Sequence, residues 1–187
     1  MICYRHCEYN TPVRSSFQPQ RRPGRYHRGV EEEPTQYLCL HPLGAQAEAL
    51  RRIDARTVAK ARALDLRIWA IDVPLDELVE LPFADAWVGD DYAPCQDLAA
   101  TLRESDRPGA IVPSAALPGT QNVVLFGGRA AAPYQGALTR PTEVQASIAG
   151  EHGCALETLV PLVRFRGQRH PGADFVFREP SWVYAYA

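Results

Sequence analysis

Two short apolar runs on either side of a Pro-Gly turn constrain this chain toward a β-sheet fold. The runs are GAIVP at 109–113 and NVVLFG at 122–127, and the stretch between them is SAALPGTQ. Short apolar segments rich in β-branched residues and bounded by Pro and Gly are typical of buried strands joined by a turn. The sequence therefore predicts two strands here, with the hydroxyl of Ser114 directly after the first.

The rest of the chain mixes further strands with few helices. By β-branched and aromatic content, strands are expected at 37–40, 66–73, 156–165, 174–178 and 181–187, with a turn at 167–173. Pro42 stands where a helix can begin, so a helix is expected over 43–64, and an amphipathic helix over 95–104. This order favours a mixed α+β domain over a regular parallel βαβ array.

Length, charge and hydropathy limit the class of protein. The 187 residues suit one domain over 1–187, and 46% hydrophobic content is enough for a core. The formal net charge of -2 argues against direct nucleic-acid binding. No stretch reaches the roughly 20 apolar residues that span a bilayer, and the N-terminus lacks the apolar core of a signal peptide. We therefore expect a cytoplasmic protein that does not bind membranes.

The segment 8–34 is rich in Pro, Arg, Gln and Gly, which predicts a long loop or a weakly structured arm. Residues 1–28 hold six arginines and one glutamate, a local balance of +5, before Glu31–Glu33 reverse the sign. Mixed charge of this kind is typical of a solvated loop.

Five cysteines form an odd set with no CxxC pair, which indicates reduced thiols rather than a disulfide framework. Cys3, His6 and Cys7 are close in sequence, but no second ligand pair at the spacing of a zinc finger follows them. No metal site is expected.

Taken alone, Ser114 is open to three interpretations: a nucleophile, a hydroxyl that holds a ligand, or a turn residue. Its context, Pro-Ser-Ala-Ala, does not match the Gly-x-Ser-x-Gly elbow, and the five histidines show no ordered triad pattern. The Walker and Rossmann glycine patterns are also missing from the sequence. Glu48 is a single acid on an Ala- and Leu-rich helical turn, either solvent-facing or catalytic.

Three motifs in order, with a helical segment between the last two, carry a family resemblance. They are GRYHRG at 24–29, QYLCLHPLGAQAEALR at 36–51 and IVPSAALPGTQNVVLFG at 111–127, with DDYAPCQDLAATLR at 90–103. Together they resemble the RES family, named for an arginine, a glutamate and a serine, which includes bacterial toxins of toxin–antitoxin pairs. The resemblance covers about residues 4–135. It implies an ADP-ribosyltransferase-like mixed sheet and cleavage of NAD at the nicotinamide–ribose bond.

Residue by residue, the family's arginine is Arg25, its glutamate is Glu48 and its serine is Ser114, and Tyr26 and Tyr37 match aromatic positions of its pocket. The resemblance implies that Arg25 anchors the pyrophosphate through paired hydrogen bonds. Glu48 would stabilise an oxocarbenium-like transition state. The two tyrosine rings would lie against nicotinamide or adenine, and Ser114 would orient the substrate without a covalent intermediate.

Two stretches depart from the family pattern. Pro23-Gly24 stands where the family often has Gly-Gly, which stiffens the approach to Arg25. GVEEEP at 29–34 replaces the usual Asn-Pro-Gly stretch, and its charges have no assigned role. Residues 136–187 lie beyond the resemblance, and their strands would complete the sheet or form a surface for an antitoxin.

The resemblance also implies partners. NAD is the substrate, water or inorganic phosphate is the acceptor, and no further cofactor is required. A cognate antitoxin with a helix-turn-helix part would cover the NAD pocket. Two alternatives remain open: mono-ADP-ribosylation of a protein target, and a non-catalytic binding module with a vestigial pocket.

Overall fold

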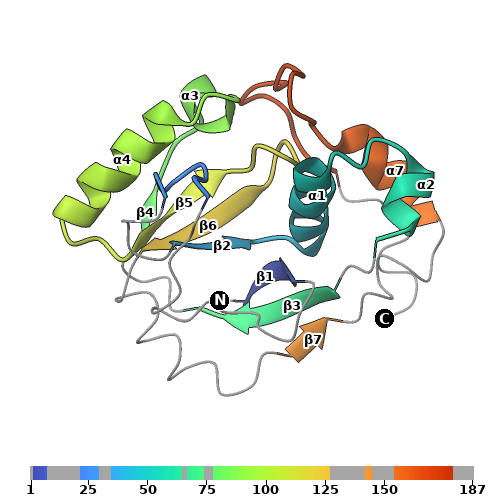
Figure 1. Cartoon of the computed structure of the whole chain (residues 1–187), viewed down its shortest axis with the longest axis horizontal. Helices are drawn as coiled ribbons and strands as arrows, with labels where there is room; N and C mark the ends of the chain where they lie inside the picture. Colours follow the sequence, from blue (N-terminus) through green and yellow to red (C-terminus); the bar gives the residue numbers. More distant parts are fainter. Residues whose placement is uncertain are drawn as a thin grey trace.

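The protein is built on a seven-stranded mixed sheet, seen in a computed structural model that describes residues 2–7, 22–29, 35–64, 67–73, 78–126, 142–144 and 154–178 (Figure 1). The strands lie in the order β4-β5-β6-β2-β1-β3-β7. Their bounds are β1 Ile2–Cys7, β2 Thr35–Cys39, β3 Arg67–Asp72, β4 Val79–Glu80, β5 Gly109–Pro113, β6 Gln121–Phe126 and β7 Thr142–Val144. Only the β4–β5 pair is parallel among these strands. The predicted α+β class is therefore confirmed.

The two predicted strands around Ser114 form an antiparallel hairpin, β5 and β6, in which Pro113 pairs with Gln121. The turn between them is closed by the N–H of Ser114, which donates to the Thr120 carbonyl at 2.9 Å. On its other edge β6 pairs with β2, where Cys39 faces Asn122. The turn between β5 and β6, residues 114–120, is called the serine turn below. The register brings it to the same end of the sheet as the end of β2 and the start of β6.

Five helices accompany the sheet within the described residues: α1 Pro42–Ile53, α2 Val58–Arg62, α3 Asp85–Val88, α4 Ala93–Glu104 and α7 Cys154–Leu162. Helix α1 begins directly after β2, with Pro42 in its first turn and the His41 ring accepting the Leu43 N–H. Figure 1 shows α4 and α1 on either side of the β5–β6 hairpin, with the blue 22–29 segment between them. None of the helices in these ranges is long and apolar enough to cross a membrane.

The expected single helix over 43–64 is wrong in one respect, because the chain forms two helices there. Asp54 ends α1 in the left-handed conformation, with φ of 57°, and its N–H bonds back to the Arg51 carbonyl. The Thr57 side chain then caps α2 by accepting the Lys60 N–H. A left-handed residue cannot continue a helix, so the direction of the chain changes between the two segments.

The expected strand at 156–165 is also wrong, because Cys154–Leu162 is helix α7. Its buried residues Leu156, Leu159 and Val160 follow a helical spacing and pack against α1 and α2. The segment expected as a strand at 174–178 has no regular secondary structure, and 181–187 lies outside the described residues. Strand β1, which no sequence pattern indicated, pairs with both β2 and β3.

Core residues lie on both faces of the sheet. On one face α4 covers a cluster made by Tyr26, Cys95, Ala99, Ala110, Val112, Val124 and Phe126. The opposite face carries Cys3, Leu38, Ile71, Val73, Val123 and Leu125. A third cluster joins α1, α2 and α7 to Ala116 and Leu117 of the serine turn. The turn that follows β5 is therefore part of the packed interior.

A buried ion network fixes α1 against the rest of the molecule. Arg51 is 5% exposed and donates to the Ala115 carbonyl at 3.2 Å, to the Arg164 carbonyl at 2.6 Å and to Asp90 Oδ1 at 2.6 Å. Asp90 Oδ2 accepts the Gly167 N–H. Partial burial raises the pKa of Asp90, but that N–H and the Arg51 and Arg164 guanidinium groups outweigh it and lower the pKa below its usual value.

We expect the replacement Asp90→Asn to weaken folding at neutral pH and to flatten the acid dependence of stability. A carboxyl whose pKa is lowered by folding stabilises the folded state above its unfolded pKa of about 3.9. That contribution is lost as the pH falls through the lower folded pKa. Urea unfolding from pH 7 to pH 2 should therefore show the two proteins converging in acid.

The matched control is Asp97→Asn, because Asp97 pairs with Arg28 in an exposed position. Its free energy of unfolding should stay close to that of the wild type at every pH. Parallel pH curves for the wild type and Asp90→Asn would contradict the role given to the network.

Candidate functional site

Strand alternation places Tyr37 and Asn122 on one face of the sheet, beside the turn that carries Ser114. Tyr37 pairs with Val124, and Asn122 pairs with both Cys39 and Val112. Because paired residues share a face and side chains alternate along a strand, Tyr37 and Asn122 point to the same side, as does the chain at Ser114. This is the face that α4 and Tyr26 cover. The sheet register thus provides a common floor for the site.

Glu48 reaches this floor from α1. Its Oε1 accepts a hydrogen bond from Asn122 Nδ2 at 2.7 Å and a long one from Ser114 Oγ at 3.4 Å. Within the described residues Oε2 has no hydrogen-bond partner. The carboxylate is therefore held by one oxygen, and the second oxygen remains able to act on a ligand.

Ser114 is 1% exposed, and its hydroxyl oxygen and proton all have hydrogen-bond partners. The oxygen accepts the N–H groups of Ala116 at 3.3 Å and Leu117 at 3.1 Å, so both lone pairs are occupied. Its proton points to Glu48. His170 contacts the Ser114 carbonyl oxygen rather than the hydroxyl. This geometry combines a turn residue with a hydroxyl that orients Glu48, and it disfavours a nucleophile.

Arg25 lies in a tight turn whose ends, Gly24 and His27, form a β-bridge. Its Nη1 donates to the carbonyls of Trp87 at 3.1 Å and Gly89 at 2.6 Å, and the guanidinium lies 4.7 Å from the centre of the Tyr92 ring. These contacts use one nitrogen of a group with five N–H donors. The guanidinium is thus held by the end of α3 and by Tyr92, the residue before α4.

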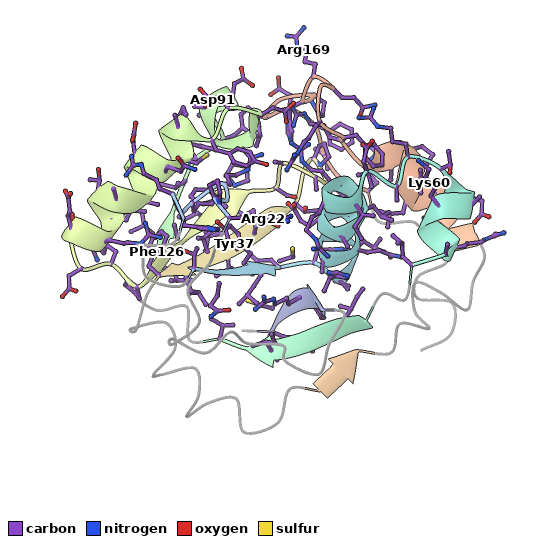
Figure 2. All side chains as sticks on the ribbon, in the orientation of Figure 1. Arg22, Tyr37, Lys60, Asp91, Phe126 and Arg169 are labelled. Atoms are coloured by element: carbon purple, nitrogen blue, oxygen red, sulfur yellow. The ribbon has the colours of Figure 1, made fainter. Side chains whose placement is uncertain are left out.

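The two tyrosines have different positions. The ring of Tyr26 is 2% exposed and packs in the core under α4, as a core aromatic does. Tyr37 is half-buried on β2, and its hydroxyl accepts the Tyr26 N–H at 3.0 Å. Figure 2 shows Tyr37 in the interior, whereas Arg169 projects away from the molecule. Burial raises the pKa of both phenols, which therefore stay protonated at neutral pH.

His27 completes the turn through the Tyr37 hydroxyl. Its Nε2 lies 2.8 Å from the Arg22 carbonyl, which can only accept, so Nε2 carries the proton. In the tautomer with its only ring proton on Nε2, Nδ1 accepts the Tyr37 O–H at 2.7 Å. A Cβ added at Gly24 would lie 2.2 Å from the His27 ring. Gly24 is therefore required by close packing, and the preceding proline is compatible with the turn.

Helix α4 secures the same turn from the outside. Gln96 Nε2 donates to the carbonyls of Gly24 at 2.9 Å and His27 at 3.2 Å. Two helical turns further along the same face, Arg103 Nη2 donates to the Tyr26 carbonyl at 2.9 Å and to Thr35 Oγ1 at 2.8 Å. The sequence analysis missed both residues. Their spacing of seven, which places polar side chains on one helical face, is the signal that could have found them.

The segment after α7, residues 163–178, makes hydrogen bonds to the serine turn. Arg164 N–H donates to the Ala116 carbonyl at 2.8 Å, and His170 Nε2 donates to the Ser114 carbonyl at 3.3 Å. The His170 Nδ1 accepts the Gly172 N–H, and burial lowers the pKa of the ring, so it is neutral at pH 7. A cavity of about 260 Å³ lies beside Ser114, His170 and two phenylalanines. Sequence analysis gave this segment no part in the site.

Comparisons with known proteins identify the family of the chain and a structure with a similar fold. A chain of the crystal structure of the M. tuberculosis MbcT–MbcA toxin–antitoxin complex superposes with a TM-score of 0.57 at 17% identity, over 86% of this chain and 88% of that chain. The similarity shows a shared fold. A comparison with curated proteins finds no match. The family model of the RES domain matches residues 2–144, and the chain therefore belongs to the RES domain family.

Proposed function

We propose that the protein cleaves NAD at the nicotinamide–ribose bond. The observation that carries this proposal is the Glu48 carboxylate, with Oε1 held by Asn122 and Ser114 and Oε2 left without a partner in the described residues. Family membership and the fold shared with a toxin–antitoxin complex support the same conclusion.

The chemistry requires a fixed negative charge beside the sugar. When the C1′–N bond breaks, its electron pair leaves with nicotinamide, which becomes neutral, and positive charge develops on the ribose. A carboxylate stabilises that charge more than it stabilises the ground state. An oxygen of water or phosphate then bonds to C1′ and releases a proton. The products are nicotinamide and ADP-ribose or its 1-phosphate ester.

Arg25 is the candidate anchor for the pyrophosphate. Its position is fixed by the Trp87 and Gly89 carbonyls and by the Tyr92 ring. A guanidinium held in this way presents planar paired donors, which match two phosphate oxygens. Tyr37 is the better placed of the two tyrosines to contact a planar ring, because the Tyr26 ring is enclosed by the core. Ser114 acts through Glu48 and the turn, with no covalent intermediate.

In the cell this activity would make the protein the toxin of a toxin–antitoxin pair. The structural relative was solved as a toxin–antitoxin complex, so a protein antitoxin is the proposed partner. The resemblance implies that its antitoxin carries a helix-turn-helix part. Loss of NAD would then be prevented while the antitoxin covers the site.

The replacement Glu48→Gln should lower NAD turnover by about 100- to 1,000-fold, because an uncharged amide stabilises the developing positive charge poorly. Purified protein is mixed with NAD, with and without phosphate, and the ribose product is identified by mass spectrometry. Phosphate-dependent formation of the 1-phosphate ester would identify phosphorolysis. Wild-type turnover in Glu48→Gln would overturn the assignment, and the exposed α7 variant Glu157→Gln serves as the control.

Both Arg25→Lys and Arg25→Ala should raise the KM for NAD about tenfold or more, since lysine keeps the charge but not the paired donors. Steady-state kinetics of the two variants, beside the exposed control Arg28→Lys, make the measurement. If Arg25→Lys binds NAD as well as the wild type does, paired donation to the pyrophosphate is wrong.

We expect the replacement Ser114→Ala to reduce turnover but not abolish it. Two N–H groups and one carboxylate oxygen lose a partner, which costs about 1–3 kcal/mol of stability for a buried group. Urea unfolding and NAD turnover are measured together. Background-level turnover, with a covalent adduct on Ser114 detected in the wild type, would instead make this serine a nucleophile.

A further inference from the structure

Asn122 stands at a point where three strands meet the site. It is the second residue of β6 and pairs with Cys39 of β2 on one side and Val112 of β5 on the other. A position between two paired strands is one where an apolar β-branched residue is usually preferred. Strand pairing alone therefore does not explain an amide side chain at this position.

The orientation of this amide is fixed by its partner. A carboxylate only accepts hydrogen bonds, so the group 2.7 Å from Glu48 Oε1 is the Nδ2 donor. The Oδ1 atom is then directed away from Glu48. It is buried and has no hydrogen-bond partner in the part of the chain that the structure describes. A buried carbonyl without a donor costs free energy.

We propose that Asn122 is a positioning residue for Glu48, retained at the expense of stability. Its Nδ2 fixes Oε1, and this leaves Oε2 as the oxygen that faces the ribose. The unpaired Oδ1 is the consequence of orienting the amide for the carboxylate. The inference rests on the proposed cleavage of NAD and assigns a residue outside the arginine, glutamate and serine of the family.

The alternative role for Asn122 is purely structural, and it makes a different prediction. A structural amide would lower stability when removed, whereas a positioning amide lowers activity and leaves stability equal or greater. Asn122→Leu removes both the donor and the unpaired carbonyl at similar size. The matched control is Gln121→Leu. The neighbouring Gln121 donates a hydrogen bond of 2.8 Å to the Glu80 carboxylate and not to Glu48.

For Asn122→Leu we expect kcat to fall about 10- to 150-fold with KM for NAD nearly unchanged, the range for a hydrogen bond to a charged group. The urea midpoint should equal or exceed that of the wild type, and Gln121→Leu should keep its kcat. Unchanged kcat in Asn122→Leu, or a lower urea midpoint with kcat and KM affected alike, would overturn the proposal.

Asn122→Asp provides a readout that needs no NAD. It would place a second carboxylate beside Glu48, and two such groups share a proton, which raises the pKa of the pair. Among the described residues, the Cys39 thiol of β2 is a titratable group coupled to Glu48, and burial raises its pKa, so it stays uncharged. Carboxyl NMR titration, with Glu48→Gln to assign the signal, should show the shift.

The two readouts separate the failure of this inference from that of the proposed function. A wild-type protein that leaves NAD intact would overturn the cleavage reaction and with it the positioning of Glu48 for that reaction. An active wild type whose Glu48 titrates identically in Asn122→Asp would overturn only the contact between Asn122 and Glu48 in solution.

Discussion

The buried guanidinium of Arg51 is the constraint on which the other parts of the molecule depend. It donates to the Ala115 and Arg164 carbonyls and to the Asp90 carboxylate, and so joins α1, the serine turn, the segment after α7 and the loop before α4. A charge removed from water is tolerated only when its donors are satisfied. None of these four segments can therefore shift without leaving part of a buried cation unpaired.

Residues of the same network lie next in sequence to Ser114 and to the carbonyl that holds Arg25, and on the same helix as Glu48. Glu48 lies three residues before Arg51 on one helical face, and Ser114 directly precedes Ala115. The Gly89 carbonyl that receives Arg25 directly precedes Asp90. Arg25, Glu48 and Ser114 come from distant parts of the chain, yet each is attached to the same rigid group. If these residues form the proposed site, the ion network would preorganise it.

Local patterns predicted the parts of the fold that local chemistry decides. The hairpin around Ser114 and the start of α1 at Pro42 follow from short apolar runs, turn residues and a helix-compatible proline. The prediction of a strand at 156–165 was wrong because an apolar run with Val and Pro resembles a strand. The helical spacing of its apolar residues is favoured only once they pack against α1 and α2. The break at Asp54 is different, because it is made by local capping at Asp54 and Thr57 inside a pattern that otherwise favours one continuous helix.

For the candidate site, the sequence singled out Glu48 and Ser114, which the structure brings into contact, but not the group that orients Glu48. Glu48 and Ser114 are identified by their motifs, whereas Asn122 contacts Glu48 across 74 positions of the chain. It does so only because β6 pairs with β2 in the register that sets Cys39 opposite Asn122. A shift of one residue would turn the amide to the other face and leave the carboxylate free to rotate. In the proposed site, the choice of the Glu48 oxygen that meets a ligand would therefore follow from the sheet register, which no motif contains.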